Sequence, residues 1–331
     1  MRIRPHLWIA IAATCSALAF AGAASAQAWK PEKPVEIVSG TTGGGADRMA
    51  RTILLLMQEK KLVTTPVAVV AKVGAGNSIA YHYVSQKAGD PHYLLASTLS
   101  LSVGHLTGRS KLGYRDFTPI CMLFDEYVTI LSRSDSPIRT GKDLIDRLRA
   151  DPSSLSIGFS SAIGSATHLG FAMVLRAAGV DVKKLRIVVF DSAAKGITAM
   201  LGGHVDVSAS SLSSAVTHLQ AGTIRALGIT SQQRIGGVYA QTPTWKELGA
   251  DASFSSYRGM SAAKDISPPQ VAFWENVFAT IDQDPRWHEE GEKYLVHRQF
   301  RRSREARKYL DDLDGPIKSL LDELGLTGKG A

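Results

Sequence analysis

Long apolar runs are almost absent from this chain of 331 residues. The run from Leu7 to Phe20 is too short to span a bilayer comfortably, and no later segment approaches the roughly 18 to 20 apolar residues of a membrane helix. Arg2 and Arg4 precede this run and small residues follow it, which is the pattern of a secretory signal. We therefore expect residues 1–26 to be a signal peptide, and a mature periplasmic protein that starts at Gln27.

Cysteine is also scarce, since Cys15 and Cys121 are the only two. Cys121 alone would remain in the exported chain, which excludes an internal disulfide and predicts a small buried apolar residue. Cys15 leaves a lipid-anchored protein as an alternative. The residues before it, Ala12-Ala13-Thr14, lack the leucine and the small residue that usually precede a lipidated cysteine, so a protein without a lipid is favoured.

Charge of one sign is not concentrated anywhere in the chain. Loss of Arg2 and Arg4 would leave 36 of the 38 basic residues against 30 acidic ones, a mature net charge of +6. This mild excess attracts acidic solutes, but the basic residues are not interleaved with aromatic ones. The composition therefore argues against a nucleic-acid partner.

Motifs of catalysis and of cofactor binding are missing. Gly43-Gly44-Gly45 lacks both the Gly-Lys-Ser/Thr ending of a P-loop and the spacing of a dinucleotide fingerprint. No Gly-x-Ser-x-Gly elbow occurs, and no paired His or Cys stands at metal-ligand spacing. We therefore expect no enzyme activity, no cofactor and no metal.

Strands alternating with helices are what the chain does contain. Residues 35–38 form a β-branched segment, a glycine-rich loop follows, and Met49, Ile53, Leu56 and Met57 fall on one face of a helix. A second run of such units starts after 152, and about 305 mature residues usually make two domains. This α/β pattern predicts parallel sheets of right-handed βαβ units, one sheet per domain.

The C-terminal part follows another pattern. From Pro268 onward the apolar residues keep helical spacing, so we expect a wholly helical tail. The basic run at 301–308 is interpreted as a solvated helix face.

Small polar loops follow the predicted strands, where ligands bind in open α/β sheets. Glycine allows the backbone to approach a ligand, and free amides at a helix N-terminus bind anions. A carboxylate would fit such loops without any arginine, although each loop could instead serve only tight packing of helix on strand. The candidate ligand-binding residues are Thr41, Thr42, Gly43, Gly44, Gly45, Ala46, Asp47, Gly74, Ala75, Gly76, Asn77, Thr98, Ser160, Ser161, Gly164, Ser165, Ala166, Thr167, His168, Asp191 and Ser210.

Two of these candidates have alternative roles. His168 could act as a base or ligand donor, but support of its loop as a neutral hydrogen-bond partner is favoured. Asp47 lies in the first turn of a predicted helix, where a carboxylate complements the dipole, and this role is favoured over ligand contact.

The order and spacing of several short motifs resemble the substrate-binding receptors of tripartite tricarboxylate transporters, the Bug-type extracytoplasmic solute receptors. The resemblance covers nearly all of the mature chain. It is carried by Lys33-Pro34-Val35-Glu36-Ile37-Val38, Gly43-Gly44-Gly45-Ala46-Asp47, Gly74-Ala75-Gly76, Gly164-Ser165-Ala166-Thr167-His168-Leu169, Gly202-Gly203-His204-Val205-Asp206, Ala221-Gly222-Thr223-Ile224-Arg225-Ala226-Leu227 and Thr242-Pro243-Thr244.

The resemblance implies a type II periplasmic-binding-protein fold, with two Rossmann-like lobes joined by two crossover strands. Lobe 1 would comprise 27–126 and 255–331, and lobe 2 would comprise 127–254. A ligand carboxylate would be held by the first βα loop and the Gly-Ala-Gly loop, and its other end would meet the helix that starts near 164–168. The hinge would lie near 127–130 and 256–259.

The chain departs from the family pattern where ligand identity is decided. Ser210-Ser211 replaces a common Asp-Asn pair, which argues for an uncharged or purely acidic ligand. Asp191 complicates this, because a carboxylate facing the cleft would repel an anion.

The resemblance implies a monomeric receptor that delivers a small carboxylate to membrane permease subunits. A receptor that presents its liganded form to a sensor kinase would use the same cleft and stays an alternative. Neighbouring permease or kinase genes would separate the two.

Overall fold

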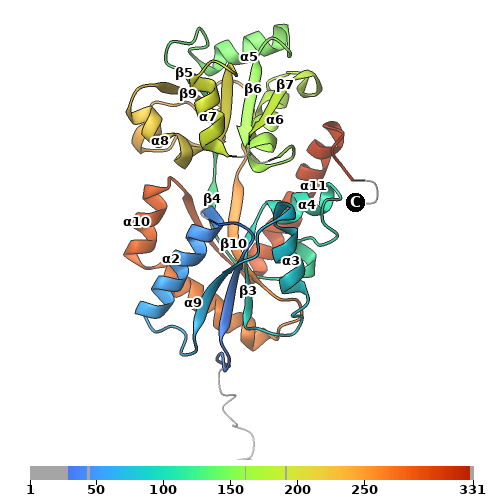
Figure 1. The fold of residues 1–331 in the computed structure, drawn as a ribbon, viewed down its shortest axis with the longest axis vertical. Coiled ribbons are helices and arrows are strands. Elements are labelled where there is room, and N and C mark those ends of the chain that lie inside the picture. Colours follow the sequence, from blue (N-terminus) through green and yellow to red (C-terminus); the bar gives the residue numbers. More distant parts are fainter. Residues whose placement is uncertain (1–28, 43–44, 161, 191, 329–331) are drawn as a thin grey trace, which may run out of the picture.

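The computed structural model describes residues 29–42, 45–160, 162–190 and 192–328. The predicted signal peptide (1–26) and Cys15 therefore lie outside the described residues. Two sheets, stacked along the long axis, define two lobes (Figure 1). We call the lobe with the six-stranded sheet the first lobe and the lobe with the five-stranded sheet the second lobe.

The sheet of the first lobe has the strand order β11-β4-β10-β3-β1-β2. Its strands are β1 (Val35–Ser39), β2 (Val67–Ala71), β3 (Tyr93–Thr98), β4 (Thr118–Glu126), β10 (Ser256–Ala262) and β11 (His297–Arg302). Strand β1 pairs in parallel with β2 and β3, whereas β10 runs antiparallel to both β3 and β4.

Helices cover both faces of this sheet because its buried strands are apolar on both sides. Val35 and Ile37 of β1 pack with one set of helices and Val38 with the other, as the alternation of a strand requires. The first set comprises α2 (Gly45–Glu59), α9 (Pro268–Asp282) and α10 (Pro285–Lys293). The second comprises α3 (Ser78–Ser85), α4 (Ser100–Leu106) and α11 (Ser303–Glu323), on the opposite side in Figure 1.

The sheet of the second lobe has the order β7-β6-β8-β5-β9. Its strands are β5 (Val128–Arg133), β6 (Ser156–Ser160), β7 (Arg186–Phe190), β8 (Val207–Ser211) and β9 (Ile224–Ile229). Helices α5 (Gly141–Ala150) and α6 (Ala166–Ala177) pack with one face, and α7 (Ala193–Leu201) and α8 (Leu212–Gln220) with the other.

Two expectations about the elements were wrong. Both sheets are mixed rather than parallel, because the strands that enter from the other lobe, β10 and β5, run against their neighbours. The tail is not wholly helical either, since it contains β11. The basic run at 301–308 therefore begins in a strand and only then enters α11.

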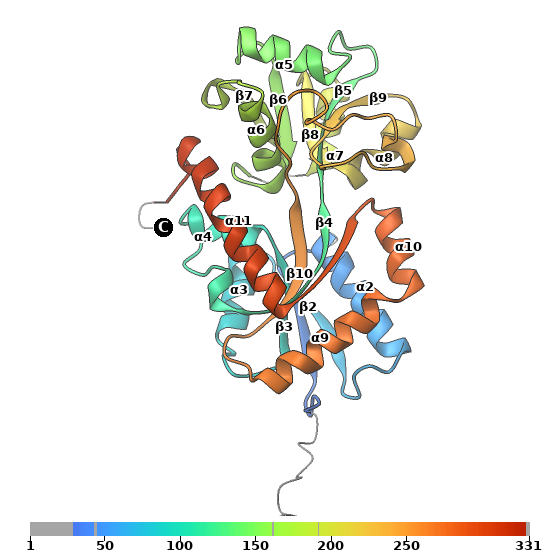
Figure 2. The same cartoon turned by 180° about the vertical axis from the view of Figure 1, so that it is seen from behind.

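The two lobes are connected by adjacent strands. Strand β4 ends at Glu126 and β5 begins at Val128, so Tyr127 alone separates them. The chain returns along β10, where Ser256 pairs with Glu126. Both connections are seen side by side from front and back (Figures 1 and 2).

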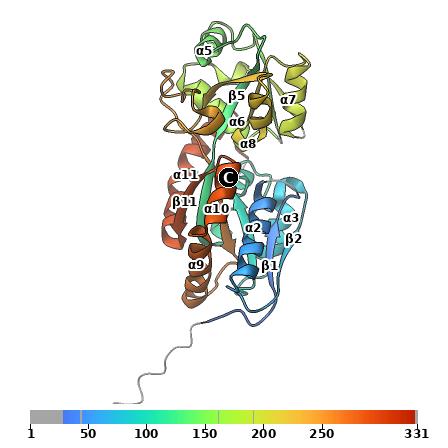
Figure 3. The same cartoon turned by 90° about the vertical axis from the view of Figure 1, so that its left-hand side faces the viewer.

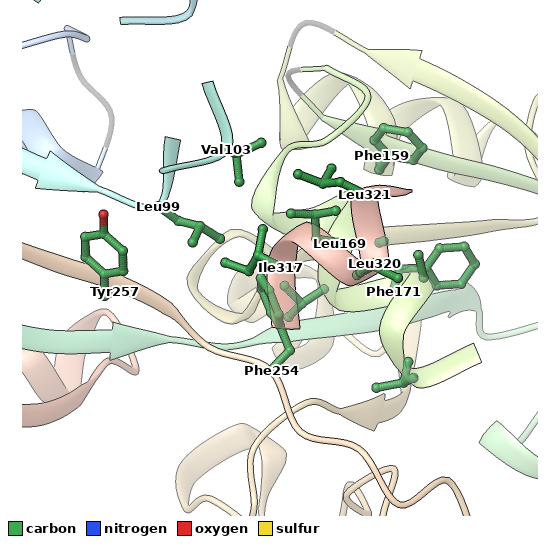
Figure 4. Packing of buried hydrophobic residues seen from close by; sticks show 14 of the residues in the cluster. Leu99, Val103, Phe159, Leu169, Phe171, Phe254, Tyr257, Ile317, Leu320 and Leu321 are labelled. Carbon is green, nitrogen blue, oxygen red and sulfur yellow. The ribbon is translucent and has the colours of Figure 1, made fainter. Parts of the chain in front are cut away.

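The last helix extends the contact between the lobes. Ile317, Leu320 and Leu321 of α11 are fully buried in a cluster that also contains Leu169 and Phe171 of α6 (Figure 4). Arg176 of α6 donates to Glu323 of α11 at 2.8 Å. The second lobe therefore rests on the end of α11 as well as on the two connecting strands.

Candidate functional site

A cleft with a volume of about 800 Å³ lies between the lobes. Its walls come from the loops after β1, β2 and β3 and from those after β6, β7 and β8. In each sheet these strands run parallel and end at the edge that faces the other lobe, since residues of the loops that follow them line the one cleft. The cleft thus collects helix N-termini from both lobes, which is where open α/β sheets bind ligands.

Most residues predicted from the sequence as ligand-binding line this cleft: Thr41, Gly45, Ala46, Ala75, Gly76, Asn77, Thr98, Ser160, Gly164, Ser165, Ala166 and Thr167. Five others do not line it: Thr42, Asp47, Gly74, His168 and Ser210. Gly43, Gly44, Ser161 and Asp191 lie outside the described residues. Contact with a ligand stays a prediction for all of these residues.

The loop after β1 presents a hydroxyl to the cleft. Ser39 Oγ donates to the carbonyl of Thr41 at 2.9 Å and so tightens the turn. Thr41 Oγ1 is buried and has no hydrogen-bond partner among the described residues. A buried hydroxyl without a partner is costly, and a polar ligand atom would remove that cost.

The loop after β2 is strained. Gly74, Ala75, Gly76 and Asn77 all have positive φ, and Ala75 at 47° and Asn77 at 77° are not glycines. A Cβ on Gly40 would lie 2.6 Å from the Asn77 side chain, so the first two loops are in close contact. Backbone strain of this kind is typical of sites that hold a ligand.

Tyr81 of α3 points a second unpartnered hydroxyl at the cleft. Its side chain is buried, and its oxygen makes no hydrogen bond of good geometry to a described residue, although Asn77 and Thr98 lie close enough to lower its pKa slightly. Burial raises the pKa of Tyr81 to about 12. The hydroxyl therefore stays protonated and is available as a donor.

The second lobe contributes the N-terminus of α6. Gly164 has φ of 82°, and Ser165 is the N-cap, whose Oγ accepts from the His168 amide at 3.4 Å. Ser165 Oγ also donates to the carbonyl of Ser160 at 3.0 Å, which fixes the loop to β6. The free amides of the first turn of α6 are therefore held ready for an anion.

His168 supports this turn from below. It stacks on Phe159 with ring centroids 4.9 Å apart, and its Nδ1 accepts from the Gly164 amide at 2.9 Å. Burial lowers the pKa of His168 to about 4. The ring is neutral at physiological pH, and its contacts are those of a loop support.

Asp47 is turned into its own helix. Its carboxylate is buried and accepts from Arg51 Nε at 2.9 Å, one turn along α2. Ser210 is likewise fully buried inside β8, and Ser211 lines the cleft in its place.

Two charged residues in the cleft were missed by the sequence analysis. Arg258 of β10 and Glu126 of β4 form an ion pair with an Nη2–Oε2 distance of 2.5 Å, and each side chain is 15 % exposed. A third, Arg109, lies beside the Gly164 turn, and its Nε donates to Thr107 Oγ1 at 3.0 Å. Among the described residues the cleft thus contains two guanidinium groups and one carboxylate.

A family comparison decides what kind of site this is. Residues 49–326 match the model of the family described as "Tripartite tricarboxylate transporter family receptor". The chain belongs to this family. Its members are solute-binding receptors and not enzymes, so the cleft is a receptor's binding cleft, and the resemblance seen in the sequence is confirmed.

Individual relatives agree with this assignment. A protein of Cupriavidus necator, "UPF0065 protein in gbd 5'region", is 26% identical over 96% of both chains. The periplasmic binding protein BugD superposes with a TM-score of 0.73 at 23% identity, covering 90% of this chain and all of its own. An R. palustris protein solved with adipate gives 0.76 at 21% identity, over 90% and 99% of the two chains. The two-lobe binding-protein fold is therefore confirmed.

The sequence did carry a signal for the charged residues of this receptor. Arg258 interrupts an otherwise apolar and small strand, and Glu126 follows Asp125 at the end of an apolar one. Neighbours in a strand face opposite sides, so Glu126 faces the cleft and Asp125 lines a separate hollow behind the strands. Burial raises the pKa of Asp125.

The part of the chain that the structure describes contains no helix long and apolar enough to cross a membrane. It also contains no group of three or more His, Cys, Asp or Glu that could hold a metal ion.

Proposed function

We propose that this receptor captures a small carboxylate in the cleft between its lobes and delivers it to the permease subunits of a tripartite tricarboxylate transporter. The anion would lie among backbone amides, hydroxyls and guanidinium groups supplied by both lobes. A ligand that touches both lobes stabilises their closed arrangement, which is the signal a permease could read.

One observation carries the proposal. Two buried hydroxyls, of Thr41 and Tyr81, and the Nε of Arg258 lack partners among the described residues, and all three residues line the same cleft. Buried polar groups in folded proteins are nearly always satisfied, so these donors indicate a polar ligand. The described lining contains two arginines and one glutamate, a net charge of +1, which favours an acidic ligand.

The proposal extends to location and organisation. We further propose a monomer without a lipid, and its export to the periplasm is supported by the signal pattern of residues 1–26 and by the similarity to the periplasmic binding protein BugD. The division into lobe 1 (27–126 and 255–331) and lobe 2 (127–254) is supported by the membership of the two sheets. Adipate in one structural neighbour supports a carboxylate as the ligand.

A thermal-shift screen tests the ligand class. Mature protein from Gln27 would be heated with mono-, di- and tricarboxylates, aromatic acids and neutral analogues of each. A ligand at 100 times its Kd adds about 2.7 kcal/mol to the free energy of unfolding, so a true ligand raises the melting temperature by several degrees. Shifts by neutral amides but not by acids would contradict the proposal.

A further inference from the structure

The floor of the cleft holds an acceptor and a donor side by side. Glu126 ends β4, Arg258 lies in β10, and these two strands pair and connect the lobes. The pair therefore lies both in the proposed binding cleft and on the two strands that connect the lobes. It is also sheltered from solvent, since 15 % of each side chain is exposed.

Neither partner is saturated by the other. Arg258 Nη2 donates to Glu126 Oε2, but Arg258 Nε is buried without a partner among the described residues. The ion pair engages only Oε2 of Glu126, which leaves Oε1 available to a ligand. A Cβ on Gly45 would lie 2.7 Å from Arg258 Nη2, so the guanidinium rests against the first turn of α2, whose amides favour the same anion.

A carboxylate without a further polar group can hydrogen-bond to Arg258 but not to Glu126. Its oxygens accept from Arg258, but they also approach the Glu126 carboxylate, and like charges repel. A hydroxyl or ammonium group on the carbon next to the ligand carboxylate would donate to Glu126 and turn this repulsion into a hydrogen bond. A site that hydrogen-bonds such a group discriminates against the analogue without it, because the largely sheltered acceptor would otherwise be left without that partner.

We propose that Arg258 and Glu126 together select a carboxylate with a hydrogen-bond donor on its α-carbon, a 2-hydroxy or 2-amino acid, over the unsubstituted acid. This inference rests on the proposed receptor function and names the ligand class of the same cleft. It differs from the uncharged or purely acidic ligand that the Ser210-Ser211 replacement favoured, because the cleft obtains its carboxylate from Glu126 of β4 instead.

The test uses acids matched in carbon skeleton. Titration calorimetry would compare succinate, malate and aspartate, then glutarate, 2-hydroxyglutarate and glutamate, then adipate, 2-hydroxyadipate and 2-aminoadipate. In at least one set the substituted acids should bind about 10- to 100-fold more tightly than the plain acid, the range expected of a hydrogen bond to a charged group.

Glu126→Gln separates recognition from support. The amide still accepts from a hydroxyl but no longer attracts an ammonium, so the preference for the amino acid should fall about 10- to 100-fold and that for the hydroxy acid less. Arg258→Lys keeps the ion pair but loses the planar, two-pronged guanidinium donor. It should lower the affinity for all the acids about 10-fold without changing their order. Arg286→Gln, whose partner Glu59 is on the outer surface, is the matched control and should leave all affinities unchanged.

Each outcome decides something. Equal binding of plain and substituted acids overturns the inference and leaves the receptor function standing. A preference for the amino acid that stays undiminished in folded Glu126→Gln overturns the assignment to this pair, and if that variant does not fold, unchanged affinity of Arg258→Lys for every acid does so instead. Binding of no acid at all overturns the receptor function and the inference together.

Discussion

A neutral imidazole beneath the binding turn makes His168 a residue whose contribution depends on pH. Its pKa in the folded protein is lowered from 6.5 to about 4 by burial, so the unfolded chain takes up the proton first as pH falls. The stability linked to His168 is therefore complete above pH 6.5 and is lost between pH 6.5 and about 4.

The variant His168→Asn tests this linkage. The Asn oxygen can still accept from the Gly164 amide, but it does not titrate. Between pH 7.5 and 4.5 the free energy of unfolding in urea should fall more in the wild type than in the variant, by as much as about 3 kcal/mol. Parallel curves for the two proteins would show that the ring is not held neutral.

Gly45 is a second residue whose role can be tested alone, because its lack of a side chain leaves room for the Arg258 guanidinium. A Cβ there would lie 2.7 Å from Arg258 Nη2 and 2.9 Å from its Cζ, and the guanidinium is the movable end of its side chain. Gly45→Ala should therefore keep the fold, displace the guanidinium from Glu126 and weaken acid binding about 10-fold.

Gly315→Ala is the control for that substitution. Gly315 is a helical glycine in α11 with open space around its Cβ position, but a Cβ before Pro316 is disfavoured in a helix and offsets the gain in helix propensity, so alanine there should change stability little and leave binding unchanged. Calorimetric titration of both variants checks the pair of expectations. Unchanged affinity in Gly45→Ala would remove Arg258 from the ligand contact.

Some residues of the cleft could be predicted from the sequence and others could not. Gly164, Ser165 and Thr41 were predicted because loops after strands have a recognisable composition. Arg258 and Glu126 were not, because they lie inside strands whose meeting in space depends on the two connections between the lobes. Two residues that pair across 132 positions of the chain leave no local sequence pattern that predicts their contact.

At the scale of elements, one side chain at the N-terminus of α6 has two roles. Ser165 caps the helix and lines the cleft. Ser165→Ala should lower the free energy of unfolding by about 1 kcal/mol, as loss of an N-cap usually does, and weaken ligand binding about 10-fold.

Thr140 provides a matched comparison within the same lobe. It caps α5 by accepting from the Asp143 amide at 3.1 Å, and it does not line the cleft. Thr140→Ala should cost similar stability with no change in affinity. If both variants bind the ligand alike, the first turn of α6 does not contact it.

The elements that sequence reasoning predicted are those with local causes. The βα units of both lobes follow from strand composition, glycine-rich loops and helical periodicity. Strand β11 was missed because four of its six residues, HRQFRR, are charged or histidine. It pairs with β4 at the edge of its sheet, where charged residues are tolerated and discourage further pairing.

At the scale of the whole molecule, the lobes are not joined by two strands alone. The end of α11 shares a buried cluster with α6, and Val103 of α4 lies 3.5 Å from the Cβ position of Gly164. Pro316 interrupts the hydrogen bonding of α11 just before the residues that contact the second lobe. The lobe boundaries and the hinge at 127–130 and 256–259 stay predictions.

This arrangement predicts an asymmetric closure. The side where α11 meets α6 is already packed, so ligand-induced rotation should bring α8 towards α10, on the other side of the molecule (Figures 1 and 3). Spin labels on cysteines introduced at Thr217 and Glu289 would report the moving side, and labels at Ala177 and Asp322 the packed side.

The tightest acid of the matched sets should shorten the distance between labels at 217 and 289 and leave that between 177 and 322 unchanged. Cys121 should not interfere, because it is fully buried and burial raises the pKa of its thiol. Closure needs the ligand to bridge both lobes, so Glu126→Gln with a weakly bound acid should close only partly at the same concentration. Equal shortening of both distances would mean that α11 separates from α6 during closure, and no shortening at saturation would rule out a hinged receptor.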